Sequence, residues 1–217
     1  NRLGYALTGA HIAAVIWSDD PSADMARLDA AAEAFGQAAG ARPLSVLASA
    51  ATRWVWVPGS ATGDRIDTAA LQDAVTDMPD IRVAIGSTAE GIDGFRRSHL
   101  DALTTQQMMA RLHSPQRIAL FTDVQLVALI TADTDRAADF VHHTLGGLET
   151  AGPELQTAVR VFVDEQCNAS RTAARLYTHR NTLLRRLARA DELLPRPLAE
   201  SSVNVAVALD VVRWRSG

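Results

Sequence analysis

The sequence predicts an α+β protein, in which a ferredoxin-like βαββαβ domain precedes an all-α domain that contains a helix–turn–helix. Three observations carry this prediction. Strand-like and helix-like patterns alternate over the first half of the chain, helix-like patterns alone follow from Thr122 onward, and residues 168–189 combine helix–turn–helix spacing with six arginines. The 217 residues suffice for two small domains, and a composition of 47% hydrophobic and 21% charged residues is typical of globular proteins.

Four strands and two helices are expected in the first domain. In chain order they are a strand at 11–17, a helix from about Ser22 to Ala39, strands at 44–49 and 53–58, a helix at 66–77 and a strand at 82–86. The first strand is a short apolar run (HIAAVIW), and Gly40 ends the first helix. The two middle strands lie close enough in the chain to form a hairpin. This order predicts an antiparallel sheet with helices on one face.

The rest of the chain is predicted to be almost entirely helical. A long helix at about 91–112 and an extra strand at 117–121 follow the sheet, and further helices are expected at 124–130, 134–145, 154–167 and 200–214. The glycine pair Gly146-Gly147 and the step Gly152-Pro153 separate these helices. We therefore place an α/β domain at 1–122, a helical connector at 123–150 and a C-terminal helix–turn–helix domain at 151–217. The last helix is apolar on most sides, which predicts that it is buried against the helix–turn–helix.

Residues 171–194 show the spacing of a helix–turn–helix. Ser170 is the expected N-cap of a first helix from Arg171 to Tyr177, and Thr178 is the expected cap of the second helix. The second helix has a predicted buried stripe at i, i+4, i+7 and i+11, formed by Leu183, Leu187, Ala190 and Leu194. Its N-terminal end and opposite face carry polar side chains, namely His179, Arg180, Asn181, Thr182, Arg185 and Arg189, with Arg186 at the border.

Positive charge is concentrated in residues 168–189. This window holds six arginines and no carboxylate, and since the whole chain carries −4, the remainder sums to −10. A polyanion explains such a cluster, and DNA is the polyanion that helix–turn–helix spacing indicates. The candidate DNA-binding residues are Arg171, Arg175, His179, Arg180, Asn181, Thr182, Arg185, Arg186 and Arg189. The alternative is a solvated arginine-rich helix without a ligand, although a solvated face normally mixes charges of both signs.

Residues 172–187, T-A-A-R-L-Y-T-H-R-N-T-L-L-R-R-L, resemble the C-terminal helix–turn–helix of PucR/CdaR-type bacterial transcriptional regulators. The similarity extends over roughly 154–212, and residues 83–103 are similar to the end of the GGDEF-like domain that precedes this motif in such regulators. The resemblance implies a degenerate GGDEF-like domain joined to a DNA-binding domain. The chain departs from the family pattern at Arg185, where an aromatic residue is frequent, and at Tyr177-Thr178, which replaces a polar–Val pair. These departures concern sequence preference rather than the fold.

The first domain is expected to be non-catalytic. Diguanylate cyclases, which the resemblance brings into comparison, use a Gly-Gly-Asp/Glu-Glu-Phe turn between the second and third strands to hold metal ions and nucleotide phosphates. The corresponding residues 48–53 (ASAATR) contain neither glycine nor carboxylate. Asp19 and Asp20 follow the first strand, where a metal ligand could lie, but beside Pro21 they are more simply a turn and a helix cap. We therefore expect no metal, no cofactor and no enzymatic activity.

The remaining candidate sites have simple structural interpretations. Trp54 and Trp56 lie on one face of a strand and are expected in the core or in a domain interface, with a ligand pocket as the alternative. Cys167, the single cysteine, has no identifiable Cys–His partner and is expected to be a packed thiol. One cysteine permits no disulfide within a chain, and no apolar run approaches the ~20 residues needed to span a bilayer. A cytoplasmic protein without a membrane partner is therefore expected.

The sequence as a whole predicts a regulator that binds double-stranded DNA as a homodimer or a higher oligomer. One helix–turn–helix contacts too few base pairs to locate a site in a genome, which is why two-fold pairing is expected. The chain begins with Asn1 rather than Met, so an upstream domain that senses an unknown metabolic effector is also expected. Two alternatives remain. One is a nucleotide cyclase, which an assay with GTP and magnesium would reveal, and the other is a signalling scaffold whose helix–turn–helix contacts protein instead of DNA.

Overall fold

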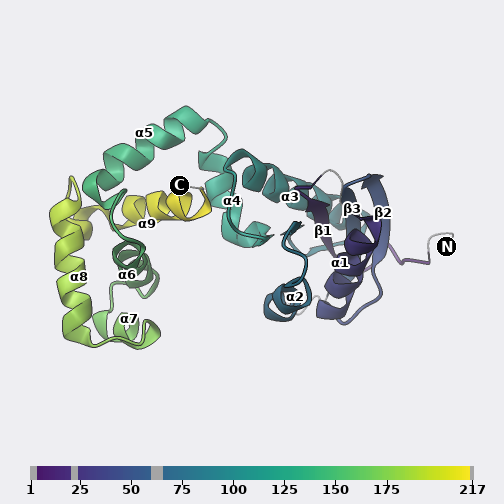
Figure 1. Cartoon of the computed structure of the whole chain (residues 1–217), viewed down its shortest axis with the longest axis horizontal. Helices are drawn as coiled ribbons and strands as arrows, with labels where there is room; N and C mark the ends of the chain where they lie inside the picture. The colour runs from purple at the N-terminus through teal and green to yellow at the C-terminus, as the bar shows by residue number, and fades with distance from the viewer. Residues whose placement is uncertain (1–3, 21–23, 60–65, 216–217) are drawn as a thin grey trace. The chain divides into compact units, whose positions relative to one another are not determined.

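A computed structural model describes residues 4–20, 24–59 and 66–215. Ser22, the predicted start of the first helix, lies outside these ranges. The chain divides into two compact units, Asn1–Ala128 and Leu129–Gly217 (Figure 1). Unit 1 holds the sheet and its helices, whereas unit 2 is helical. The predicted combination of an α/β domain followed by an all-α domain is confirmed.

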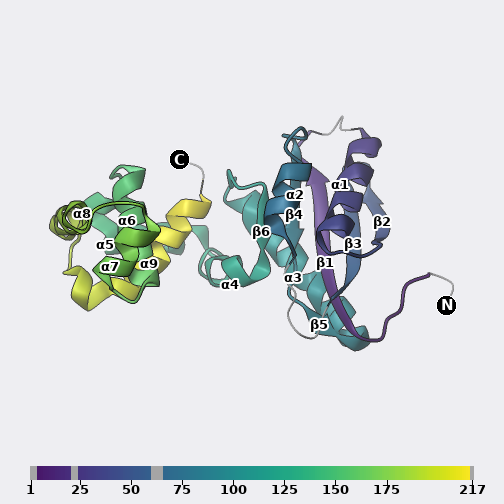
Figure 2. The ribbon, with the colours of Figure 1, turned by 90° about the horizontal axis from the view of Figure 1, so that it is seen from below.

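Unit 1 is built on a sheet of β1 (Ala10–Ser18), β2 (Leu44–Ser49), β3 (Thr52–Gly59), β4 (Ile81–Ile85) and β6 (Ile118–Leu120). Their order is β2-β3-β1-β4-β6, and Figure 2 shows β2 and β6 at the two edges. β1 pairs antiparallel with both β3 and β4, as the βαββαβ pattern predicts. β6 pairs in parallel with β4, so the sheet is mixed rather than purely antiparallel. A two-residue strand, β5 (Ala89–Glu90), pairs with the start of β1 and was not predicted.

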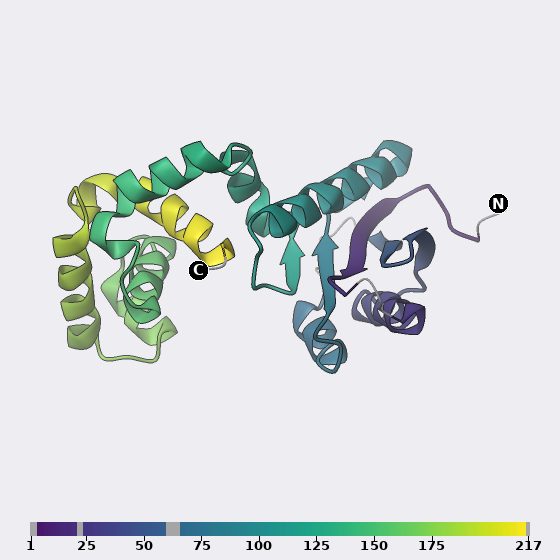
Figure 3. The ribbon, with the colours of Figure 1, turned by 45° about the horizontal axis from the view of Figure 1, so that its top comes forward.

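Helices cover both faces of this sheet (Figure 3): the two helices of the βαββαβ pattern share one face, as predicted, and the long helix that follows the pattern covers the other. α1 (Met25–Ala38) and α2 (Thr68–Ala74) pack on one face, against β1 side chains such as Ile12 and Ile16. α3 (Gly91–Arg111) packs on the other face, near Ala13. All nine residues of β1 are buried, because a central strand that is covered on both sides exposes neither of its two sets of side chains.

The two tryptophans of β3 pack beneath α3, where Trp56 is buried and Trp54 is half-buried. Trp56 stacks on Phe95 with ring centroids 4.6 Å apart, and its Nε1 donates to the Phe95 carbonyl oxygen over 3.2 Å. The ring centroids of Trp54 and His99 are also 4.6 Å apart. Both rings contact aromatic side chains of α3. Of the predicted alternatives, the structure therefore supports packing in the core, with Trp54 at its edge.

Unit 2 consists of α5 (Thr134–Leu145), a 3-10 turn at Gly146–Leu148, α6 (Pro153–Asp164), α7 (Ala169–Arg175), α8 (Arg180–Leu193) and α9 (Leu198–Trp214). α4 (Phe121–Ile130) runs across the division between the two units. The last helix is buried, as predicted, but its main partners are not the helix–turn–helix: α9 buries Val205, Leu209 and Trp214 chiefly against α5 and α6. None of the helices in the described ranges combines the length and the apolar character that a membrane-crossing segment needs.

His99 makes the stability of unit 1 sensitive to pH. Its ring contacts those of Trp54 and Trp56, at centroid distances of 4.6 and 4.9 Å, and burial lowers the pKa of His99 below the ordinary value of 6.5. As the pH falls below 6.5, the unfolded chain takes up a proton that the folded unit resists, so the free energy of unfolding decreases. Urea unfolding between about pH 7.5 and about pH 5.5, followed by tryptophan fluorescence, is expected to show this decrease.

His99→Phe keeps an aromatic ring in the cluster and removes the titrating group, so it is expected to flatten the pH dependence. His179→Phe, at an exposed site in unit 2, is the matched control and should leave the pH dependence unchanged. A decrease of the same steepness in His99→Phe and in the unmodified chain would show that another group is responsible.

Candidate nucleic-acid interface

α7 and α8 form the predicted helix–turn–helix, with a turn at residues 176–179 between them (Figure 1). Tyr177 has a left-handed backbone with φ +49°, and the Thr178 amide donates to the Ala173 carbonyl oxygen over 2.9 Å. The small side chain of Ala173 is buried in α7, as its place in the motif predicts. The tight turn and the small residue together allow α8 to pack against α7.

The predicted start of the first helix is wrong by two residues. α7 begins at Ala169, and its N-cap is Asn168 rather than Ser170. The Asn168 Oδ1 accepts hydrogen bonds from the amides of Ser170 and Arg171, each at 3.1 Å. Both residue types are good caps, so the sequence pattern alone did not separate the two positions.

α8 begins at Arg180, and its N-cap is His179 rather than the predicted Thr178. The His179 side chain makes no capping hydrogen bond, so the first amides of α8 have no side-chain partner from the cap. The predicted apolar stripe is confirmed, since the residues buried along α8 and just after it are Leu183, Leu187, Ala190 and Leu194. Burial of this stripe turns the opposite side of α8 toward solvent.

The candidate DNA-binding side chains lie on α7, in the turn and on α8. Those exposed to solvent are Arg171, Arg175, His179, Arg180, Asn181, Arg185 and Arg189, and those half-buried are Thr182 and Arg186. Arg186 therefore lies at the border between the buried and the exposed sides of α8, as its spacing predicts. The fold thus gathers the whole predicted set within one helix–turn–helix.

Four of the clustered arginines form ion pairs with carboxylates that lie outside residues 168–189. The pairs, with their N···O distances, are Arg171–Glu165 at 3.3 Å, Arg175–Glu165 at 2.9 Å, Arg186–Glu154 at 2.7 Å and Arg189–Glu192 at 2.7 Å. Glu154 belongs to α6, and Glu165 follows directly after it. Residues 168–189 contain no carboxylate, but these four arginines are still compensated. Their carboxylate partners come from α6, from the residue after it and from the end of α8.

Arg180 and Arg185 differ from the other four arginines of the cluster. In the part of the chain that the structure describes, neither takes part in an ion pair, and both are exposed. An exposed guanidinium group without a carboxylate keeps its donors available for a phosphate or for the edge of a guanine. These two residues carry the least compensated positive charge of the candidate interface.

Two exposed side chains of this region were missed by the sequence analysis. Tyr177 in the turn is 98% exposed, and Leu184 on α8 is 39% exposed. A signal for Leu184 was present, because it lies outside the apolar stripe of α8 and next to Arg185. A phenol can donate to a phosphate, and an aliphatic side chain can contact a thymine methyl group.

The prediction that Cys167 is a packed thiol is wrong, because Cys167 is exposed. α6 ends at Asp164 instead of continuing to Cys167. Gln166 and Cys167 have left-handed backbones, with φ +54° and +57°, and they connect α6 to α7. The thiol therefore lies in a surface turn.

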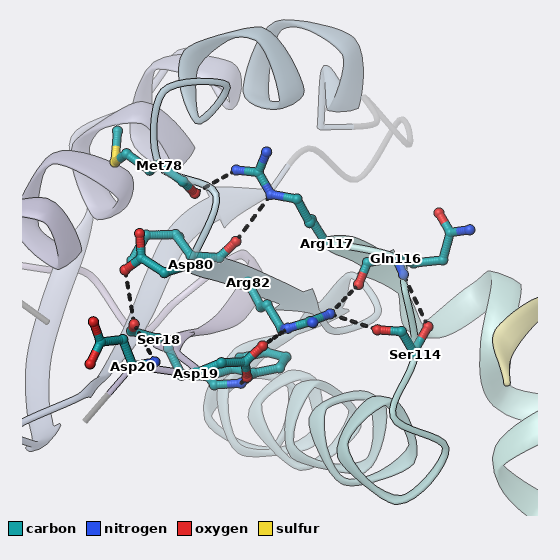
Figure 4. Close-up of polar contacts among 11 residues, drawn as sticks. Ser18, Asp19, Asp20, Met78, Asp80, Arg82, Ser114, Gln116 and Arg117 are labelled. Atoms are coloured by element: carbon teal, nitrogen blue, oxygen red, sulfur yellow. Dashed lines mark hydrogen bonds and ion pairs between the residues drawn. The ribbon is translucent and has the colours of Figure 1, made fainter. Parts of the chain in front are cut away.

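In unit 1, an arginine pairs with Asp19, the residue after β1 that was considered as a metal ligand. Asp19 follows β1, forms an ion pair with Arg82 of β4 and accepts a hydrogen bond from Trp17 Nε1 over 3.2 Å. The Arg82 guanidinium also donates to the carbonyl oxygens of Ser114 and Gln116, over 2.7 and 2.8 Å (Figure 4). The negative charge of Asp19 is thus balanced by a protein cation that is itself held in place by two carbonyl groups.

Asp80, another carboxylate at this end of the sheet, is also bound to side chains of the protein. Asp80 accepts a hydrogen bond from Ser18 Oγ over 2.9 Å and pairs with Arg27 of α1 at 2.8 Å. Within the described ranges, no three His, Cys, Asp or Glu side chains are grouped to hold a metal ion. The turn between β2 and β3 is Ala50-Ala51, which offers no polar side chain. These residues do not fit a metal-dependent nucleotide site.

Two family models match the chain. The GGDEF-like domain matches residues 1–108, and the PucR C-terminal helix-turn-helix domain matches residues 155–211. The purine catabolism regulatory protein of Bacillus subtilis (strain 168) is 35% identical over 79 residues, which cover 34% of this chain and 15% of that protein. The match therefore spans a small part of the relative's length.

Among solved structures, the crystal structure of a regulator of polyketide synthase expression from Bifidobacterium adolescentis resembles the chain with a TM-score of 0.43. The sequence identity is 15%, and the match covers 97% of this chain and 82% of that one. The GGDEF-like match falls within unit 1, and the helix-turn-helix match falls within unit 2. The chain thus joins a GGDEF-like domain to a PucR C-terminal helix-turn-helix domain, and it belongs to the PucR/CdaR type of bacterial transcriptional regulators.

Proposed function

We propose that the chain binds double-stranded DNA through unit 2 and acts as a sequence-specific transcriptional regulator. One observation carries the proposal: α8 is anchored by its buried apolar stripe and displays Arg180, Asn181 and Arg185 to solvent near its N-terminal end. A second helix presented in this way has the form that enters the major groove. The Bacillus relative is a regulatory protein, which agrees with this role.

The N-terminal part of α8 is proposed to contact the bases. Arg185 suits a bidentate contact to guanine and Asn181 a bidentate contact to adenine, while Thr182 can serve either and Leu184 suits a thymine methyl group. Arg180 is proposed to bind the phosphate backbone, because it lies at the first turn, where the uncapped amides also favour an anion. Tyr177 is proposed to add a hydrogen bond to a neighbouring phosphate.

The paired arginines are proposed to bind phosphates after exchanging their carboxylate partners. Arg171, Arg175 and Arg189 are exposed, and their ion pairs are therefore weak. A DNA phosphate competes with the carboxylate for the same guanidinium group. Binding then depends on the balance between the internal carboxylate and the external phosphate, which the residues around α6 help to set.

Unit 1 is proposed to be non-catalytic and to transmit a metabolic signal or to support an oligomer. The Asp19–Arg82 ion pair and the Ala50-Ala51 turn support this view, because both occupy positions that metal-dependent nucleotide chemistry would need. The signal is proposed to be sensed by another domain, and the regulator to act in the cytoplasm as a homodimer or a higher oligomer. No cofactor or metal is required for DNA binding in this scheme.

DNA binding by the full chain is expected to depend strongly on salt. Six clustered arginines can contact about four to six phosphates per protomer, which gives a slope of roughly −4 to −5 for log K against log salt concentration. Fluorescence anisotropy of a labelled duplex over a salt series measures this slope, and a genome-wide DNA pull-down with the same chain identifies the preferred sites. Binding that is equal at low and moderate salt, or the absence of binding, would refute the proposal.

Substitutions in α8 are expected to separate phosphate binding from base recognition. Arg180→Ala should weaken binding to all sequences about equally, because a phosphate contact carries no base information. Arg185→Ala should cost about 1–3 kcal/mol on the preferred site and much less on unrelated DNA. Selection of binding sites from a random duplex library with each variant checks this division, and an unaltered motif for Arg185→Ala would show that Arg185 does not read bases.

Loss of the Glu165 charge is expected to strengthen nonspecific DNA binding. Glu165 pairs with both Arg171 and Arg175, so Glu165→Gln removes the nearer carboxylate from two guanidinium groups while keeping the shape of the side chain, and Arg175 keeps Asp164 at 3.9 Å. Affinity for an unrelated duplex should rise about two- to fivefold at low salt, in line with the strength of exposed ion pairs. Glu33→Gln on α1 of unit 1 changes the net charge equally and serves as the control. Equal gains in the two variants would mean that net charge, rather than the ion pairs, sets the affinity.

A further inference from the structure

We propose that β2 is an interface between two copies of this chain, which pair edge to edge along residues 44–47. β2 lies at one edge of the sheet and is paired with β3 alone (Figure 2). Among the described residues, no main-chain hydrogen bond joins residues 45–49 to an element other than β3. Alternate amides and carbonyl groups along this strand therefore face solvent, and they form a template on which another strand can pair.

The side chains of β2 lack the charge that normally protects an edge strand. Residues 43–52 (PLSVLASAAT) contain no charged side chain. Val46 and Leu47 are 41% and 53% exposed, and as neighbours in a strand they lie on opposite faces of the sheet. The irregularity between Leu47 and Ser49 affects only the end of the strand, so residues 44–47 keep a regular edge. A regular, uncharged and partly aliphatic edge favours strand pairing over solvation.

A second copy of the chain is the occupant that this edge fits. Pairing of a strand with itself about a two-fold axis is antiparallel and brings identical side chains opposite one another. Because β2 is uncharged, this pairing opposes no like charges, which would otherwise destabilise it. With the axis at Val46, two aliphatic side chains meet next to Trp54, which lies opposite Val46 in β3. The aromatic layer beneath α3 then continues into the second copy.

The opposite edge of the sheet is less suited to this role. β6 has only three residues and leads directly into α4. A single strand pair also buries less than the ~800 Å² per partner that is usual in stable complexes, so the β2 dimer is expected to be weak and concentration-dependent. The β2 interface rests on the homodimer in the proposed function and names the surface that forms it. Its tests contain no DNA, so failure of the β2 interface is distinguishable from failure of DNA binding.

Disulfide cross-linking tests the position of the two-fold axis. Cys167→Ser first removes the exposed native thiol, and Val46→Cys is then introduced into the full chain. Antiparallel pairing centred on this position places the two Cα atoms about 4.5–5.5 Å apart, within the range of a disulfide. Mild oxidation at micromolar concentration is expected to convert most of the protein into a disulfide-linked dimer. Ile92→Cys in the same background, at a 70% exposed aliphatic position of α3, is the matched control and should remain mainly monomeric.

Two measurements on the reduced protein complete the test. Sedimentation velocity over a micromolar concentration series should show a dimer that Val46→Lys weakens by at least about tenfold and that Ile92→Lys leaves intact. Hydrogen exchange of the unmodified chain should be slower at residues 45–47 at high than at low concentration, which needs no variant. A chain that stays monomeric, equal cross-linking at the two positions, or exchange rates independent of concentration would overturn the proposal. A monomeric chain would instead mean that the free edge of β2 is open to a segment of another protein.

Discussion

Burial of one side of α8 is the constraint on which the functional surface depends. Leu183, Leu187 and Ala190 contact the rest of unit 2, and the period of the helix then determines which residues face outward. Arg185 and Arg189 are exposed because the apolar stripe lies opposite them, and Arg186 is half-buried because it lies between. The surface that we propose reads DNA therefore follows from hydrophobic packing of α8.

Charge compensation adds a second level to this surface. The fold gives carboxylate partners to the arginines of α7 and to two arginines of α8, whereas Arg180 and Arg185 have none within the described ranges. Such pairs contribute little to stability because both partners are solvated. They reduce the general, sequence-independent attraction of the surface to phosphate. Arg180 and Arg185, near the end of α8 that is proposed to read bases, stay uncompensated. In the proposed function, this distribution of charge raises the ratio of specific to nonspecific DNA binding and lowers the total affinity.

The sequence predicted most elements because their periodicity is local, and it failed where the determinant lies far away in the chain. The buried stripe of α8 was predictable from spacing. The carboxylate partners of the arginines, Glu154 and Glu165, were not, because they approach the arginines only after α6 folds beside the motif. The second face of the sheet had a readable signal: β1 is a continuous apolar run, which is typical of strands covered on both sides. Asn168 and Ser170 show the limit of local reasoning, since two good caps two residues apart differ only in the geometry of the preceding turn.

In unit 1, an ion pair and hydrogen bonds stabilise the end of β1. The Asp19 carboxylate after β1 is 52% exposed, and a neighbouring cation balances its charge. Arg82 supplies that cation, and its Nη1 donates to the carbonyl oxygens of Ser114 and Gln116, so the network ties β1, β4 and the segment after α3 together. The hairpin that would present a phosphate-binding turn is instead short and apolar, with Ala50-Ala51 at its tip. Because neither this turn nor β2 carries a charged side chain, this edge of unit 1 is suited to strand pairing, which is the role proposed for it above.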